Sequence, residues 1–478
     1  MSSGGGLLQL VATGVQDIFL IGNPQTTFFK TVYQRHTNFS MESIFAPGDG
    51  DLNFGNKIVY KVPRSGDLMN TIILEVDLPQ LQSVNPYSSF NGGGEISWVN
   101  ALGHALISKV ELEIGGQVID KQYGEWMEIW SQLSTPTSRK YAYDTLISRY
   151  DNYTIVKGPL TVYIPLQFWF CRNIGTALPL VALQYHEVKI NVYFRPFEQL
   201  YTFGPFNYCV GSKTGNVVNI TTNTPEFAAT DVNKIIVWSD GTTDTIQSRT
   251  NSLQVITVSS GNKPSQSFYI KPNDSILPNQ NYKILDARMY IDYIYLDTYE
   301  RRKFAQMKHS YLIEQIQYSE PESYTVGQTS KKFNLNFNLP IRSLYWVAQL
   351  NAVALTNDWF NYSNTVDPNT VKGDALASAQ LLLNGIERFE ARTAPYFRLV
   401  QPLQYHTTTP QNWVYMYSFA LKPEEHQPSG QCNFSKLDVV DLNITFNALA
   451  GNSSFRCYGI NYNVLRIFSG MAGVAFSN

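Results

Sequence analysis

The sequence predicts an all-β fold of two consecutive eight-stranded antiparallel jelly rolls, a double jelly roll, with a large loop insertion in the first. Three observations lead to this prediction. Strand-like alternation of apolar and polar residues is frequent and helical periodicity is scarce. The strand pattern also occurs twice along the chain. Finally, aromatic residues reach 14% and charged residues only 15% of the 478 residues, a composition that favours sheets with large buried surfaces.

The clearest predicted strands alternate, or run apolar, over strand lengths. They are residues 57–62, 71–78, 109–114, 289–296 and 332–339. Turn sequences separate the strands, and Gly-Gly at 115–116 and Asn-Gly at 384–385 stand between apolar runs in the manner of tight β-hairpins. This pattern predicts an antiparallel sandwich or barrel.

Internal repeats then divide the chain. Residues 182–194 (ALQYHEVKINVYF) align with residues 434–446 (FSKLDVVDLNITF), with apolar residues on apolar residues and Asn191 on Asn443. Upstream, residues 30–36 align with residues 303–309, again in the same order along both halves. Two long units of similar strand order suit two jelly rolls.

We therefore expect an N-terminal arm over residues 1–24, a first jelly roll over residues 25–297 and a second over residues 298–478. The first unit is longer because residues 201–280, rich in Ser, Thr, Asn, Gly and Pro, separate its last two strands. Strand-like pieces inside this stretch, at 234–239 and 253–260, predict an ordered surface insertion that faces outward.

Bulk properties exclude several classes of protein. The formal net charge of −2 gives no basic field, so we expect no direct nucleic-acid binding. The four cysteines (Cys171, Cys209, Cys432 and Cys457) form no CxxC pair and are expected to be reduced and mostly buried. No secretory signal is recognisable and no apolar run approaches the roughly 18 residues of a membrane span. We expect a soluble protein made in a reducing compartment.

His186 and Glu187 form the most suggestive candidate for a catalytic or metal site. A zinc-protease motif needs a second histidine at helical spacing, but Ile190 stands there and the flanking alternation has period two. The other histidines are far apart, at positions 36, 104, 309, 406 and 426. We interpret His186–Glu187 as the start of a strand, and we expect no catalytic, cofactor-binding or metal-binding residue and no cofactor.

Three further motifs have structural interpretations. Residues 91–98 are Gly-rich but lack the spacing and lysine of a phosphate loop, so a turn between strands is predicted. Residues 422–430 gather two glutamates and a histidine, and are interpreted as an exposed loop. The basic stretches 139–150 and 301–309 are interpreted as solvated or inter-subunit charge, since nucleic-acid binding needs a wider basic face.

Several long motifs carry a family resemblance. Residues 7–44 include Gly-Asn-Pro-Gln at 22–25 and Thr-Phe-Phe-Lys at 27–30, and residues 177–190, 290–306 and 415–435 hold further motifs. In this order, over nearly the whole chain, they resemble the major capsid proteins of nucleo-cytoplasmic large DNA viruses, which are double jelly-roll hexon proteins. Residues 201–280 match no pattern of that family.

The resemblance implies a structural virion protein and not an enzyme. It implies a homotrimer whose six jelly rolls make a pseudo-hexagonal capsomer, with many capsomers tiling the icosahedral shell of a large double-stranded DNA virus. The implied partners are neighbouring capsomers, minor capsid proteins and penton proteins, with an inner membrane beneath the shell. The implied location is the virion capsid, assembled in a virus factory of the host cytoplasm. The arm is expected to run beneath the barrels and contact neighbours or minor capsid proteins.

Two alternatives from other classes remain. A β-sandwich lectin or receptor-binding spike explains the aromatic residues but not the duplicated unit. An enzyme on a jelly-roll scaffold, such as a cupin oxygenase, needs a clustered His/His/carboxylate set, which the scattered histidines disfavour.

Overall fold

The computed structural model describes residues 4–81, 95–151, 154, 156–204, 209–221, 226–271, 282–325, 327–366, 371–448 and 451–476. The chain divides into two compact units, Met1–Phe39 and Ser40–Asn478. The first unit holds helix α1 (Gly4–Val11), the 3-10 turn η1 (Val15–Asp17) and helix α2 (Ile18–Ile21), and the predicted arm lies within it. No helix in the described ranges is long and apolar enough to cross a membrane.

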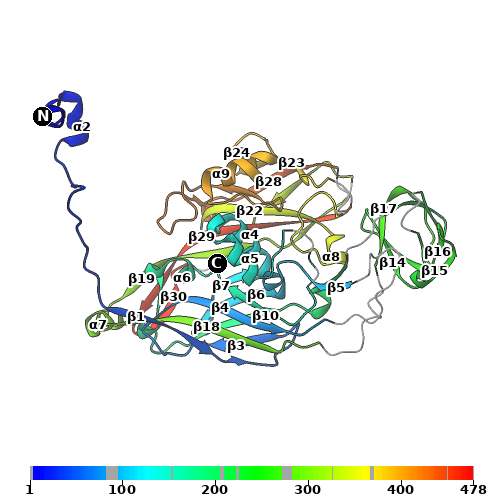
Figure 1. Cartoon of the computed structure of the whole chain (residues 1–478), viewed down its shortest axis with the longest axis horizontal. Coiled ribbons are helices and arrows are strands. Elements are labelled where there is room, and N and C mark those ends of the chain that lie inside the picture. Colours follow the sequence, from blue (N-terminus) through cyan, green and yellow to red (C-terminus); the bar gives the residue numbers. More distant parts are fainter. Residues whose placement is uncertain are drawn as a thin grey trace. The chain divides into compact units, whose positions relative to one another are not determined.

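The first jelly roll consists of two antiparallel sheets (Figure 1). One has the strand order β1-β18-β4-β8 with β9 paired to β4, and the other has the order β2-β3-β10-β6-β7. Their bounds are β1 (Phe39–Ala46), β2 (Gly48–Asp49), β3 (Lys57–Lys61), β4 (Leu68–Leu78), β6 (Ile107–Ile114), β7 (Gln117–Tyr123), β8 (Leu160–Pro165), β9 (Leu178–Pro179), β10 (Val188–Phe194) and β18 (Asp286–Leu296).

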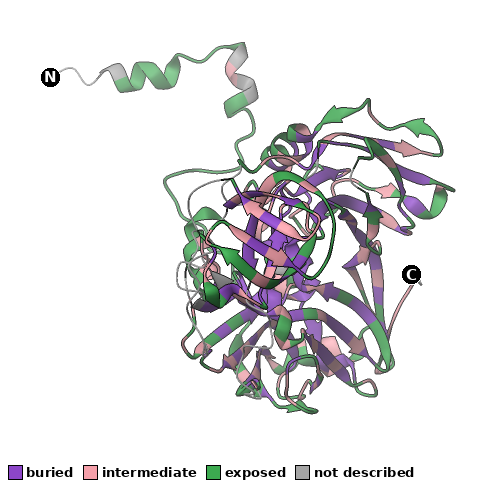
Figure 2. Cartoon of the chain, turned by 90° about the vertical axis from the view of Figure 1, so that its right-hand side faces the viewer, coloured by how far each residue is buried: buried purple, intermediate pink, exposed green. Residues whose placement is uncertain are grey.

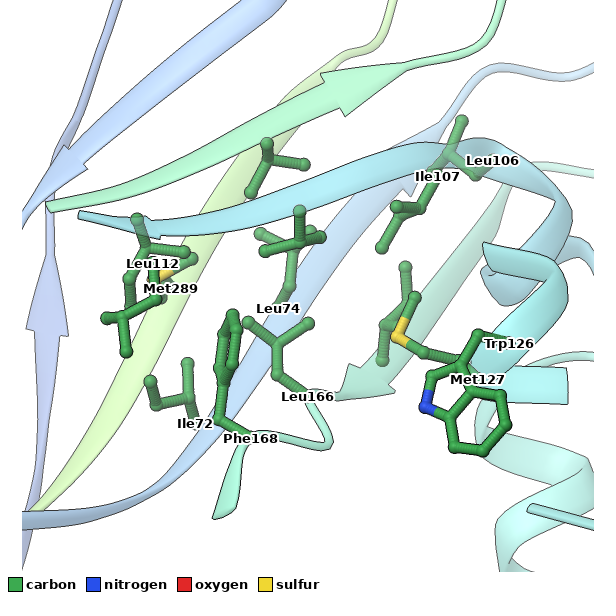
Figure 3. Packing of buried hydrophobic residues seen from close by; sticks show 14 of the residues in the cluster. Ile72, Leu74, Leu106, Ile107, Leu112, Trp126, Met127, Leu166, Phe168 and Met289 are labelled. Carbon is green, nitrogen blue, oxygen red and sulfur yellow. The ribbon is translucent and has the colours of Figure 1, made fainter. Parts of the chain in front are cut away.

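The core of this roll lies between the two sheets. Along β4, fully or largely buried residues alternate with half-buried ones, as expected for strands that present one face to a core, and Figure 2 shows the same alternation on other strands. Figure 3 shows Leu74 of β4, Leu112 of β6 and Met289 of β18 packed together with Phe168. Close packing of such side chains supplies the main stabilising contribution of the fold.

The second jelly roll repeats this arrangement. One sheet has the order β19-β29-β22-β26, with β20 and β30 paired to β29 and β27 paired to β22, and the other has the order β21-β28-β23-β24 with β25 paired to β23. Their bounds are β19 (His309–Tyr318), β20 (Glu322–Tyr324), β21 (Ser330–Asn334), β22 (Pro340–Leu350), β23 (Leu376–Leu383), β24 (Ile386–Glu387), β25 (Arg392–Thr393), β26 (Tyr415–Ser418), β27 (Cys432–Asn433), β28 (Val440–Phe446), β29 (Ser453–Phe468) and β30 (Met471–Val474).

The repeat in the sequence corresponds to equivalent strands. β10 and β28 are the segments that the repeat aligns, and each lies between equivalent neighbours: β10 between β3 and β6, and β28 between β21 and β23. Asn191 and Asn443 occupy matching places, and each side-chain amide donates to a neighbouring strand: to Glu113 Oε2 at 3.1 Å and to Gln380 Oε1 at 3.4 Å. The predicted double jelly roll is confirmed.

Both predicted hairpins are present. The β6–β7 turn has Gly115 at φ 58° and Gly116 at φ 83°, and the β23–β24 turn has Asn384 at φ 49° and Gly385 at φ 79°. Positive φ at both central positions is the geometry that matches the twist of the flanking strands, and it explains the Gly-Gly and Asn-Gly sequences.

Residues 201–204 of the 201–280 insertion form strand β11 (Tyr201–Gly204), which pairs with β5 (Glu95–Trp98). The rest of its strands in the described ranges make a closed barrel with the order β12-β13-β16-β15-β14-β17. Its strands are β12 (Cys209–Thr214), β13 (Val217–Ile220), β14 (Ile235–Trp238), β15 (Thr243–Asn251), β16 (Gln254–Thr257) and β17 (Lys263–Lys271). The barrel has its own apolar core, which includes Trp238 and Phe268. It also buries an ion pair between Lys213 Nζ and Asp244 Oδ1 at 2.5 Å, to which Trp238 Nε1 donates a further bond at 2.8 Å.

Helix α4 (Gly124–Ser134) was not predicted, because it is buried on nearly every side and lacks the amphipathic period by which a surface helix is recognised. One local prediction was wrong. Residues 332–339 were predicted as one strand, but β21 ends at Asn334. The next strand, β22, belongs to the other sheet, so the chain must cross between sheets there, and Leu339 adopts φ 63°. Residues 91–94 of the Gly-rich motif lie outside the described residues, and Glu95–Trp98 form strand β5.

Replacing Gly124 by alanine should destabilise the first jelly roll. A Cβ at this position would overlap the carbonyl oxygens of His104 and Ile107, and backbone atoms cannot move aside as a flexible side chain can. We expect Gly124→Ala to lower the free energy of unfolding by about 1–3 kcal/mol or more, measured by thermal or urea unfolding. Gly158→Ala, where a Cβ meets nothing within 4 Å, is the matched control, and equal effects of the two would contradict this account.

Candidate functional site

His186 lies at a contact between the two jelly rolls. Its Nδ1 accepts a hydrogen bond from the backbone N–H of Ala472 at 3.2 Å, and the adjacent Tyr185 N–H donates to Gly470 O at 3.0 Å. Glu187 is exposed, with its nearest cation, Lys189, at 3.8 Å, and β10 begins at the next residue. Within the described ranges, no three His, Cys, Asp or Glu residues gather in a group that could hold a metal ion. The expectation of no catalytic or metal residue stays a prediction.

Two other histidines form buried chains of hydrogen bonds. His104 Nδ1 lies 2.7 Å from Glu128 Oε2, and its Nε2 lies 3.1 Å from the Tyr143 hydroxyl. His406 repeats this arrangement, with Glu424 Oε1 at 2.7 Å and the Tyr345 hydroxyl at 3.0 Å. Each chain of hydrogen bonds joins residues that are distant in sequence, so no local spacing rule could have found it.

These Tyr–His–Glu chains are structural. Burial lowers the pKa of His104 and His406, and it outweighs the opposing effect of the glutamates. Each imidazole is therefore neutral near pH 7, with Nδ1–H donating to glutamate and Nε2 accepting from tyrosine. Burial also raises the pKa of Tyr143 and Tyr345, so their hydroxyl groups stay protonated and supply no nucleophile.

The basic stretch 139–150 contains a buried cation. Arg149 donates to Glu128 Oε2 at 2.6 Å and to Asp144 Oδ1 at 2.7 Å, and its side chain is only 10% exposed. The interpretation as solvated or inter-subunit charge was wrong for this residue, because Arg149 is buried and both its partners, Glu128 in α4 and Asp144 in α5 (Thr137–Leu146), belong to the same chain. In the second basic stretch, Arg301 is 63% exposed and pairs with Asp67 at 2.9 Å.

The loop at 422–430 is partly buried by its contacts. Glu424 is 22% exposed because it bonds to His406, whereas Glu425 is 55% exposed and pairs with Lys422 at 2.7 Å. The predicted loop is present, but its acidic residues differ in role: Glu424 fixes the loop to the second jelly roll, and Glu425 lies in solvent.

Glu125, at the start of α4, connects the two jelly rolls. Its carboxylate accepts from Arg456 Nε and Nη2 at 2.8 and 2.6 Å, from the Tyr458 hydroxyl at 2.5 Å and from the Tyr362 hydroxyl at 3.1 Å. Glu125 belongs to the first roll and all its partners to the second. Burial alone would raise the pKa of Glu125, but Arg456 and the two hydroxyl donors outweigh burial and lower it. The carboxylate is therefore ionised and fully hydrogen-bonded, as a buried charge requires.

A second set of polar contacts crosses the same boundary. Glu314 of β19 accepts from Arg172 of the first roll at 2.9 Å and from Arg342 of its own roll. Asp120 of β7 accepts from the backbone N–H of Ile316 at 3.1 Å, and burial raises its pKa to about 6. A single cluster of buried apolar residues extends across both rolls. The two rolls therefore form one body.

Two groups of exposed apolar side chains lie on the described surface, among other exposed apolar residues. In the unit Met1–Phe39, Phe28 and Phe29 are 94% and 98% exposed, and Figure 2 shows α1 exposed along its described length. In the other unit, Tyr185 is 75%, Phe468 51% and Met471 44% exposed, close to the contact between Tyr185 and Gly470. Apolar side chains exposed in groups indicate surfaces that contact other molecules.

Comparison with known proteins agrees with this architecture. Residues 27–241 match the family model described as the major capsid protein N-terminus, and residues 300–473 match that of the large eukaryotic DNA virus major capsid protein. The major capsid protein of Pyramimonas orientalis virus is 38% identical over 99% of this chain and 100% of its own length. That of Paramecium bursaria Chlorella virus 1 is 34% identical, with the same coverage of both chains.

Solved structures show the same fold. A chain of the PBCV-1 virus capsid superposes with a TM-score of 0.65 and 30% identity, over 95% of this chain and 100% of that one. The Faustovirus major capsid protein gives a TM-score of 0.66 at 13% identity, over 95% and 94% of the two chains, which supports the fold alone. The resemblance found in the sequence is confirmed: this chain belongs to the family of major capsid proteins of large eukaryotic DNA viruses.

Proposed function

We propose that this capsid protein forms a homotrimer whose six jelly rolls make a pseudo-hexagonal capsomer, and that capsomers tile the icosahedral shell of a large double-stranded DNA virus. The family assignment makes the chain a structural protein of the virion capsid and not an enzyme. One observation carries the trimer: two rolls of equivalent strand order stand side by side in one chain, joined by a cluster of buried apolar residues from both. Three-fold symmetry then arranges six similar units in a ring.

The buried contacts between the rolls support a rigid building block. A pseudo-hexagonal capsomer needs a constant angle between the two rolls of each chain. Glu125 and Glu314 each bind cations or hydroxyl groups across the boundary, and directional hydrogen bonds to buried charges permit few alternative arrangements.

The remaining partners are proposed from the exposed surfaces. The uncovered aromatic side chains of residues 28–29 and the exposed helix α1 suit contacts with neighbouring capsomers, minor capsid proteins or penton proteins, with the inner membrane beneath the shell. We propose that the 201–280 insertion faces outward and that the shell assembles in a virus factory of the host cytoplasm. The net charge of −2 supports the absence of direct nucleic-acid binding.

The purified full chain should be a trimer. We expect light scattering after gel filtration to give three times the chain mass of 54.2 kDa, and negative-stain images to show six-sided particles. A stable monomer at the concentrations used for imaging contradicts the proposal.

Removing the charge of Glu125 should destabilise the contact between the two rolls. Glu125→Gln leaves Arg456 buried without a counter-charge, so we expect the free energy of unfolding to fall by about 3–5 kcal/mol. Glu425→Gln, the same change in an exposed pair, should cost no more than about 0.5 kcal/mol. Urea unfolding measures both. The double variant Glu125→Gln/Arg456→Gln should be less destabilised than the sum of the single variants, and additivity would refute the coupling.

Acidification should destabilise the protein. Burial lowers the pKa of His104 and His406 below the ordinary 6.5. Cationic and hydrogen-bonding partners outweigh burial and lower the pKa of Glu125, Glu128 and Glu424 below the ordinary 4.5, that of Glu128 to about 2. Each group binds its proton at a lower pH in the folded state than in the unfolded state. The unfolded state therefore gains protons first as the pH falls, and stability decreases.

The loss should begin below pH 6.5, in the histidine range, and steepen below 4.5. Asp120, with its pKa raised to about 6, opposes the trend as a single group. Calorimetric unfolding midpoints between about pH 7.5 and 4 measure the effect, and His406→Asn should flatten the first part of the curve. A midpoint that rises on acidification contradicts the assignment.

A further inference from the structure

The outer face of the sheet β19-β29-β22-β26 is covered by the first roll of the same chain. Nearly every residue of β22 is buried, because the core of the second roll covers one face and the first roll covers the other. Tyr345 of β22 and Tyr458 of β29 have their ring centres 5.3 and 5.6 Å from that of Trp126 in α4. In the equivalent sheet of the first roll, β1-β18-β4-β8, the residues of β4 alternate between buried and half-buried, and those of β1 are mostly exposed. One face of this sheet is therefore open in the single chain, and we call it the open sheet face.

The strand register identifies equivalent residues in the two sheets. Fully buried pairs occur on both sides of a register shift in each sheet: Met289–Leu74 and Tyr293–Met69 in the first roll, and Cys457–Trp346 and Asn461–Ile341 in the second. The two pairs of each sheet are four residues apart along β18 or β29 and five residues apart along β4 or β22. The two central strand pairs therefore correspond residue by residue.

This correspondence relates the open sheet face to the covered one. Arg456 and Tyr458, which bind Glu125 in the contact between the rolls, correspond to Arg288 and Tyr290 of β18. Alternate residues of a strand point to the same face of a sheet, so Arg288 and Tyr290 both lie on the open sheet face. The open face thus repeats two side chains with which the covered face binds the first roll.

The other side chains of the open sheet face are apolar or acidic. Phe45 of β1 is 45% exposed, with its ring centre 6.2 Å from that of Tyr290, and Tyr163 of β8 is 36% exposed. Arg288 pairs with three carboxylates at 2.8, 2.5 and 3.5 Å, those of Glu75, Asp77 and Asp286. One guanidinium does not neutralise three carboxylates, so this cluster carries a net negative charge.

The surface with which the first roll covers the second also has a counterpart. β7 and α4 precede β8, and in the second roll β24, β25, the π-helical turn η7 (Tyr396–Val400) and helix α9 (Gln401–Tyr405) precede β26. Trp126 of α4 is fully buried, whereas four apolar residues of the counterpart are 41–77% exposed: Ile386, Leu399, Leu403 and, just after β26, Leu421. We call this surface the β24–α9 face.

The β24–α9 face offers two arginines with unused donors. Arg388 and Arg392 are exposed, and their guanidinium groups lie over tyrosine rings, 6.0 and 5.4 Å from the ring centres. The nearby Arg398 is compensated by Asp374 at 2.7 Å, but Arg388 and Arg392 form no ion pair with a carboxylate of the described residues. They therefore complement the surplus carboxylates of the open sheet face.

We propose that the open sheet face of one copy packs against the β24–α9 face of a second copy. This inference rests on the proposed trimer and identifies the two faces that form it. Inside the chain, Glu125 comes from the helix and Arg456 from the sheet; between copies, the carboxylates come from the sheet, and Arg388 and Arg392 from the β24–α9 face. Each copy has one face of each kind, so the contact is head-to-tail and closes into a ring.

The contact inside the chain also predicts which elements meet between copies. Helix α6 (Trp169–Arg172) follows β8, and its Arg172 lies 2.9 Å from Glu314 of β19. Leu421 follows β26 as α6 follows β8, and β1 is the first-roll counterpart of β19. Leu421 of one copy therefore contacts β1 of the second copy, where Met41 and Phe45 are 46% and 45% exposed.

The first test reverses the charge of one face in the full chain. Arg388→Glu/Arg392→Glu places two further carboxylates against an acidic cluster, so we expect the trimer to dissociate at a concentration about tenfold or more higher, measured by analytical ultracentrifugation. Adding Asp286→Lys should restore part of the affinity. Lys57→Glu/Lys61→Glu, the same reversal at exposed positions of β3 in the other sheet, should leave the trimer unchanged. All these positions are exposed, so the unfolding midpoints should stay close to that of the wild type.

The second test locates the contact by cross-linking. Leu421→p-benzoylphenylalanine is irradiated in a mixture of ¹⁵N-labelled and unlabelled full chain, and mass spectrometry should find a link between copies to the peptide that contains β1. The same photoreactive residue at Tyr141, 84% exposed on α5, should give no link to that peptide. A wild-type monomer overturns the trimer and this inference together. A trimer that withstands Arg388→Glu/Arg392→Glu, or whose Leu421 links lie outside the sheet β1-β18-β4-β8 of the second copy, overturns this inference and leaves the proposed trimer standing.

Discussion

The contact between the two rolls depends on one buried carboxylate that must be fully hydrogen-bonded. Glu125 lies where two jelly rolls meet, and its four hydrogen bonds all come from the second roll. Removing a charge from water is costly unless its partners are already in place. The helix that carries Glu125 must therefore start at Gly124, close to the backbone of residues 104–107, and β29 must present Arg456 and Tyr458 in register. If either roll folded incorrectly, Glu125 would be buried without its hydrogen-bond donors.

The two rolls have equivalent strands but different connections. Between β7 and β8 the first roll carries helices α4 and α5 (Thr137–Leu146). Between β25 and β26 the second roll carries the π-helical turn η7 (Tyr396–Val400) and the short helix α9 (Gln401–Tyr405). The first roll contributes the buried acids Glu125 and Asp120, and the second contributes the donors that meet them. The duplicated barrels are thus complementary at their shared boundary and keep the equivalent sheet order that the proposed ring of six similar units requires.

Local features were predictable from the sequence and distant ones were not. The hairpins follow from Gly115–Gly116 and Asn384–Gly385, and the repeat from period-two alternation, because neighbouring residues determine both. Glu125 and Arg456 are 331 residues apart, and His406 and Tyr345 are 61 apart, so no spacing rule joins them. The barrel within 201–280 was predicted only as strands, since closure depends on pairing its first strand with its last.

The closed barrel within residues 201–280 also affects how the sequence can change in evolution. β12 and β17 are antiparallel neighbours, with Cys209 opposite Phe268, so the chain enters and leaves the small barrel at adjacent points. A module with adjacent ends and its own core can be enlarged, exchanged or lost without altering the register of the strands on either side. The small barrel can therefore vary in evolution, while the duplicated framework and its buried charges stay under separate constraint.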